Sequence, residues 1–199
     1  MEIIDPLESY ENIRLARLYK IHNNYNEAIQ IYFDLIEETD EESEEYSYLL
    51  MEYGICLLEN AFTKVENEYL SLVDGNKRAK MNKDTNIEED LEYTWNCFDN
   101  ARVNFELMND DESLAVVHKY LGDILVFNNN FREAIEEYKK AQEHCINTEG
   151  FLNLQEDIAE CHVYLEEKEK AIELYEECRK IGEDDFYDEK IEELKGFCE

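Results

Sequence analysis

Three stretches of the chain share one short phrase: residues 26–32 (NEAIQIY), 132–138 (REAIEEY) and 169–175 (EKAIELY). In each stretch a tyrosine follows an alanine by four residues, which places it one helical turn along the same face. Twelve residues before each alanine stands another small residue, namely Ala16, Gly122 or Ala159. Two antiparallel helices can cross closely only where both carry a small side chain. The phrase therefore predicts a helical hairpin that recurs along the chain.

A fourth copy of this pattern is split. Gly54 stands in the first small position, and Thr94, Phe98 and Ala101 fit the second small, aromatic and third small positions. Gly54 and Thr94 are 40 residues apart where the other copies have 12, so about 28 residues are inserted. The hairpin pattern is typical of the tetratricopeptide repeat, a helix–turn–helix of about 34 residues that stacks into a solenoid.

The sequence thus predicts an all-α tetratricopeptide solenoid of four repeats, with an interrupted second repeat and a C-terminal capping helix. One proline and six glycines in 199 residues agree with long helices and few turns. We expect helices near residues 7–21, 25–38, 44–73, 88–108, 112–128, 131–146, 150–165, 168–181 and 184–198. As one domain, 1–199, the chain divides into repeats at about 9–42, 47–109 (insert 63–90), 115–148 and 152–183, with the cap at 184–198.

The charge of the chain is strongly negative, with 51 acidic and 19 basic residues and a net charge of −32. Such a field repels nucleic acid and anionic membranes and attracts basic partners. Solubility is the alternative reason for an acidic surface. The N-terminus, acidic and without an apolar stretch, is unlike a secretory signal, so we expect an intracellular protein.

The split second repeat in an acidic array resembles the SHNi-TPR family of histone chaperones, which are related to nuclear autoantigenic sperm protein. The resemblance covers about residues 9–182 and is most specific at Tyr53-Gly54, at residues 91–105 with Trp95, and at Tyr120-Leu121-Gly122-Asp123. It implies a chaperone that binds histones H3–H4, H3 in particular, for storage, transport and nucleosome assembly. It also implies work in the nucleus. Cytoplasmic residence, homodimerisation and a linker-histone ligand stay open.

The insert departs from this family, whose insertions are usually strongly acidic. Residues 63–90 hold seven acidic and five basic residues, including Lys77, Arg78, Lys80 and Lys83, which could form an import signal. The compensating acidic segment comprises seven carboxylates in nine positions: Glu37, Glu38, Asp40, Glu41, Glu42, Glu44 and Glu45. A solvated linker is the ordinary interpretation of such a run.

The binding residues are expected on the first helix of each repeat, which faces the groove of such arrays. Counting from the small positions, the inward residues include Ile13, Arg17 and Lys20 in the first repeat and Ile55 in the second. Carboxylates pair with Arg or Lys, and aromatic rings stack on guanidinium groups. The predicted histone-binding residues are Tyr48, Glu52, Glu59, Asp123, Glu156, Glu160 and Tyr164.

Other functions find little support in the sequence. A clamp for acidic peptides would need Lys and Asn where Ile13 and Arg17 stand. The four histidines lack metal-ligand spacing, and no phosphate-binding loop or activated nucleophile is visible. We therefore expect a protein that is not an enzyme and needs no cofactor or metal, and that binds neither nucleic acid nor membrane directly. An adaptor or scaffold for another basic protein is the alternative function.

Overall fold

The computed structural model describes residues 5–73, 87–182 and 185–196, and every regular element in these ranges is an α-helix. They are α1 (Ile13–Ile21), α2 (Tyr25–Glu38), α3 (Glu44–Val73), α4 (Ile87–Met108), α5 (Asp111–Phe127), α6 (Phe131–His144), α7 (Thr148–Tyr164), α8 (Lys168–Gly182) and α9 (Asp185–Gly196). The all-helical prediction is confirmed. None of the described helices combines the length and the apolar character that crossing a membrane requires.

The predicted helix bounds agree closely with the structure except at the N-terminus. Helices α2 and α3 have the predicted ends, and most others differ by one or two residues. The basic cluster at 77–83, however, lies outside the described residues. The prediction for α1 was wrong, because this helix begins at Ile13 and not near residue 7.

The segment before α1 is held by a contact distant in sequence. The Asp5 carboxylate accepts a hydrogen bond from the Leu7 backbone N–H at 3.0 Å and binds the Arg17 guanidinium. Leu7 is buried, and its carbonyl accepts a hydrogen bond from the Tyr10 N–H in a turn. These residues therefore form turns against α1 and do not extend it.

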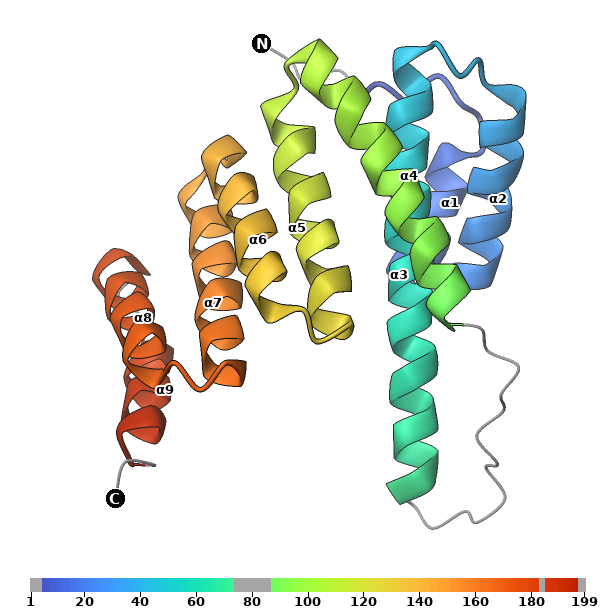
Figure 1. The fold of residues 1–199 in the computed structure, drawn as a ribbon. Coiled ribbons are helices and arrows are strands. Elements are labelled where there is room, and N and C mark those ends of the chain that lie inside the picture. Colours follow the sequence, from blue (N-terminus) through green and yellow to red (C-terminus); the bar gives the residue numbers. More distant parts are fainter. Residues whose placement is uncertain (1–4, 74–86, 183–184, 197–199) are drawn as a thin grey trace. The chain divides into compact units, whose positions relative to one another are not determined.

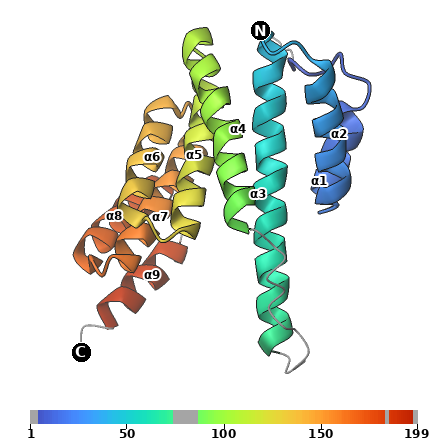
Figure 2. The same cartoon turned by 45° about the vertical axis from the view of Figure 1, so that its right-hand side comes forward.

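The contacts divide the chain into two compact units, residues 1–104 and 105–199. In the first unit α1 and α2 form an antiparallel hairpin, and α2 also packs on α3 (Figure 1). The two halves of the split repeat meet here, since the Phe98 ring on α4 touches α3 at Gly54 and the Asn104 amide donates to the Ser47 hydroxyl at 2.9 Å. Figure 2 shows that α3 extends well beyond the α1–α2 hairpin.

In the second unit two hairpins, α5–α6 and α7–α8, pack in series, and α9 packs on α8. Gly122 on α5 faces the buried Tyr138 ring on α6, as the repeat pattern predicts. The cap is a true part of the core, because Tyr187, Ile191 and Leu194 of α9 are buried against α8. The bounds proposed for the individual repeats stay a prediction.

Four helices end in the same left-handed turn. Asn23, Asn109, Asn129 and Glu166 have φ between 53° and 60°, and each follows α1, α4, α5 or α7. The N–H one residue later reaches back to the carbonyl five residues before it, for example from Asn130 to Leu125 at 2.8 Å. This motif satisfies carbonyls that the helix end leaves unpaired. The turns after α1, α5 and α7 each follow the first helix of a repeat and reflect the repetition in the sequence, whereas α4 is the second helix of the split repeat.

Candidate functional site

In the first unit the predicted binding residues Tyr48, Glu52 and Glu59 lie on α3 and are half-buried. Glu52 already has partners within the chain. Its carboxylate accepts hydrogen bonds from the Arg17 guanidinium, the shortest at 2.5 Å, and from the Tyr32 hydroxyl at 2.5 Å. Burial and the Glu52 charge raise the pKa of Tyr32 well above its usual range. Glu52 thus has a structural role that joins α1, α2 and α3.

Two residues expected to face the groove belong to the core instead. Ile13 has no exposed surface, and Ile55 is only 7% exposed. Each lies within one helical turn of the small residue at a close helix crossing, Ala16 or Gly54, where burial of an apolar side chain is favourable. The position of Arg17 agrees with the argument against a clamp for acidic peptides, because its guanidinium is bound by Asp5 and Glu52.

The acidic segment spans the end of α2, a short loop and the start of α3. Glu44 and Glu45 lie in the first turn of α3, where the positive end of the helix dipole stabilises carboxylates. Glu37 and Glu38 are exposed in the last turn of α2, where the same dipole disfavours them. The helix dipole therefore accounts for Glu44 and Glu45 but not for Glu37 and Glu38. The acids in the last turn remain candidates for contact with a basic partner.

The second unit brings four acids together, Asp123 from α5 and Glu156, Asp157 and Glu160 from α7, which we call the carboxylate cluster. Asp123 accepts hydrogen bonds from the Tyr138 hydroxyl at 2.9 Å and from Lys119 at 2.5 Å. Glu156 accepts one from the Tyr187 hydroxyl at 2.5 Å. Three of these acids were predicted from the sequence, and the structure brings them together.

Asp157 lies among the other three acids of the cluster, and Lys119 is the cation that acts on it. Burial raises the pKa of Asp157 to about 6, Lys119 lowers it, and the charges of Asp123, Glu160 and Glu156 raise it further. A carboxyl with a raised pKa is one whose ionised form lacks compensating interactions. A cation placed here by a partner would supply them.

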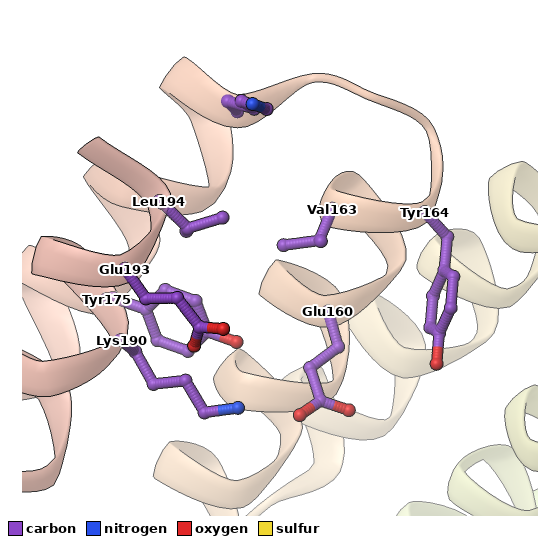
Figure 3. A pocket seen from close by; sticks show the side chains of 8 residues that line it. Glu160, Val163, Tyr164, Tyr175, Lys190, Glu193 and Leu194 are labelled. Atoms are coloured by element: carbon purple, nitrogen blue, oxygen red, sulfur yellow. The ribbon is translucent and has the colours of Figure 1, made fainter. Parts of the chain in front are cut away.

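Beside the cluster lies a groove of about 450 Å³ between α7, α8 and α9, which we call the α7–α9 groove (Figure 3). Its walls are formed by residues of α7 and of α9: Glu160, Val163, Tyr164, Lys190, Glu193 and Leu194. Lys168 and Tyr175 of α8 complete the lining. The volume falls within the range of sites that bind small molecules.

Tyr164 joins the groove to a stacked pair of aromatic rings. Its ring lies parallel to that of Phe131, with 4.7 Å between centroids and 8° between planes. Tyr164 is nevertheless 63% exposed, so the ring face away from Phe131 is accessible. An aromatic face next to the Glu160 carboxylate is well suited to an arginine or lysine.

Sequence reasoning missed Asp157, Lys190 and Glu193. Asp157 directly follows the predicted Glu156, and it would have been found if the sequence neighbours of each predicted residue had been included. Lys190 and Glu193 lie on α9, whose orientation depends on the packing of Tyr187 and Ile191 against α8. No local pattern in the sequence contains that information.

Two histidines of the second unit, His118 and His144, pair with carboxylates and with each other. The buried His118 ring meets Glu137 at 2.7 Å, and the neighbouring His144 ring meets Asp111 at 2.8 Å. The two imidazoles stack with 6.0 Å between centroids. Among the described residues no group of three His, Cys, Asp or Glu side chains could hold a metal ion.

Comparison with known protein families identifies one stretch of the chain as a tetratricopeptide repeat. A sequence profile of the tetratricopeptide repeat matches residues 121–143, which cover the end of α5 and most of α6. No match was found among curated proteins. The chain thus contains a tetratricopeptide repeat at the place where the sequence predicts its third hairpin.

Among solved structures, a putative kinesin light chain with TPR-like repeats from Podosopora anserina is 15% identical, with a TM-score of 0.47 over 90% of this chain and 97% of that one. The C-terminal part of a TPR repeat-containing protein from Cytophaga hutchinsonii is 16% identical, with a TM-score of 0.36 over 85% of this chain and 64% of that one. Likenesses this weak carry no argument about function.

Proposed function

We propose that this protein is a non-catalytic interaction module whose acidic surfaces bind a basic segment of another protein. Tetratricopeptide arrays usually act as adaptors or scaffolds, because stacked hairpins present extended binding surfaces. The observation that carries the proposal is the carboxylate cluster, in which four acids lie together and in which burial, and after it the charges of the other three acids, raises the pKa of Asp157. The net charge of −32 would draw a basic partner toward this surface.

Histones H3–H4 are the specific partner that we propose, with work in the nucleus. The support comes from the resemblance of the split second repeat and from the match between a very acidic chain and very basic proteins. A different basic protein bound by an adaptor would satisfy the same surface. The two possibilities differ in whether the chain discriminates between basic ligands of similar charge.

The first experiment is therefore binding to H3–H4 and, in parallel, to the other core-histone dimer across a salt series. Purely electrostatic attraction weakens steeply with salt and hardly separates two ligands of similar charge. Binding of H3–H4 that persists at high salt, while the other dimer is lost, supports the chaperone. Equal loss of both removes the histone assignment and leaves the adaptor.

A matched pair of variants tests the site itself. Glu160→Lys changes the carboxylate cluster, whereas Glu173→Lys makes the same change in net charge at an exposed position of α8. Loss of one close ion pair and gain of a repulsive one should weaken binding about tenfold or more for Glu160→Lys. Equal effects of the two variants would show that only net charge matters and that the cluster is not the binding site.

A further inference from the structure

The α7–α9 groove differs in charge from the rest of the chain. Its lining holds two carboxylates, Glu160 and Glu193, and two ammonium groups, Lys168 and Lys190, so its formal charges cancel. The chain as a whole carries −32. Long-range attraction of a basic partner therefore comes from surfaces outside the groove. Selection inside it depends on shape and on apolar contact.

The apolar part of the groove is a gap between two aliphatic side chains. Val163 of α7 and Leu194 of α9 point toward each other across it, and the Tyr175 ring lies below (Figure 3). Val163 is 36% exposed, although Leu194 and Tyr175 are largely buried. An aliphatic side chain inserted here would cover the part of Val163 that water now contacts.

The polar edge of the groove is defined by Glu160 and Tyr164. Glu160 is exposed and belongs to the carboxylate cluster, and Tyr164 presents one free ring face. An arginine beside the inserted aliphatic residue would meet the carboxylate and lie on the ring. An unbroken run of basic residues fits less well, because it would face Lys168 and Lys190 and leave the gap unfilled.

We infer that the α7–α9 groove holds one aliphatic side chain of the basic partner, with an adjacent arginine or lysine paired to Glu160 and stacked on Tyr164. This inference rests on the proposed function and adds a recognition rule to it. The partner would carry isolated basic residues around an aliphatic anchor. Charge brings the partner to the surface, and the groove selects its sequence.

The test uses the full chain and three labelled peptides in fluorescence anisotropy. One peptide has a single leucine between arginines, the second has serine in place of that leucine, and the third is an oligolysine of equal charge. Burial of one leucine side chain predicts that the first peptide binds at least about tenfold more tightly than the second. Its advantage over the oligolysine should grow as salt rises.

Two variants locate the contact. Val163→Arg fills the gap with a charged group, whereas Ile146→Arg makes a comparable change at an isoleucine that is 71% exposed between α6 and α7. We expect Val163→Arg to remove the leucine advantage and Ile146→Arg to preserve it. Val163→Ser, which removes apolar surface from the gap without adding a charge, serves as a second groove variant if circular dichroism shows that Val163→Arg is misfolded.

The outcomes separate this inference from the proposed function. If wild-type protein binds all three peptides with similar affinity, or if the leucine advantage survives both groove variants, the groove is not the anchor site and the adaptor function remains. If no basic peptide binds, the proposed function itself fails.

Discussion

Replacement of Gly122 by alanine should destabilise the second unit, although alanine is the better helix former. A Cβ atom built on Gly122 would lie 2.4, 2.6 and 2.9 Å from three atoms of the Tyr138 ring. Tyr138 is 3% exposed, and its hydroxyl donates to Asp123 at 2.9 Å, so the ring cannot move away freely. The ring or the whole helix has to shift to admit one methyl group.

The expected change in the free energy of unfolding combines one stabilising and two destabilising contributions. Alanine in place of glycine inside a helix stabilises by about 1 kcal/mol. Overpacking of a filled core costs about 1–3 kcal/mol, and disturbing the Tyr138 hydrogen bond adds about 1 kcal/mol. The expected net loss is about 2 kcal/mol, or about 4–8 °C in melting temperature for a chain of this size.

Gly54 provides the matched control, because the same substitution there meets the Phe98 ring at 3.0 Å. That contact needs only a small adjustment, so Gly54→Ala should change stability by less than about 1 kcal/mol. Urea unfolding followed by circular dichroism measures both variants, and fluorescence of Trp95, the one tryptophan in the sequence, reports on the first unit.

A double variant identifies the cause of the loss. In the background of Tyr138→Leu the cost of Gly122→Ala should largely disappear, because the ring that causes the clash is gone. Gly122→Ala that is as stable as Gly54→Ala, or an unchanged cost in the double variant, would refute the steric argument.

Other predictions concern charge, backbone and thiols. The pKa of Asp157 is about 6 in the folded chain and ordinarily 3.8, so the unfolding free energy should fall as pH rises between these values. Asp157→Asn should therefore raise the unfolding free energy at pH 7 by about 1–3 kcal/mol but much less at pH 4. Equal gains at both pH values would contradict this. Glu166 has φ of 60°, so Glu166→Gly should stabilise by about 1 kcal/mol in the same assay, and a loss would show that its side chain contributes more than the strain. In a Cys198→Ser background, a thiol reagent should modify half-buried Cys145 first. Burial raises the pKa of Cys56 to about 12 and keeps it and the other buried thiols from the reagent. Rapid modification of several thiols in the folded protein would contradict the described core.

The helices could be predicted from the sequence because their signals are local. Two small residues twelve positions apart, with an aromatic residue four positions after the second, define each uninterrupted hairpin within about 34 residues. Gly122 and Tyr138 meet as that spacing requires. The split repeat lacks this spacing, yet Phe98 still packs on Gly54 as the repeat pattern predicts.

The site was predicted less well because it depends on contacts between distant segments. The start of α1 depends on Asp5 meeting Arg17, and the internal role of Glu52 depends on α1 and α2 both approaching α3. The groove exists only because α9 packs on α8 in one particular rotation, which places Lys190 beside α7 residues. A helical periodicity indicates which face is apolar but not which neighbour will cover it.

The long helix α3 has a consequence for how the length of this protein can vary. With 30 residues and a rise of 1.5 Å per residue it is about 45 Å long, more than twice the length of the 14-residue α2. Near its far end Tyr69 and Leu70 are 66% and 51% exposed, so added or deleted turns there would disturb little of the core. We expect that helical turns can be gained or lost at this end during evolution, whereas the 12-residue spacing of the three uninterrupted hairpins is held by the close helix crossings. The same end of α3 could therefore carry a fusion partner or a spectroscopic label with little disturbance of the core.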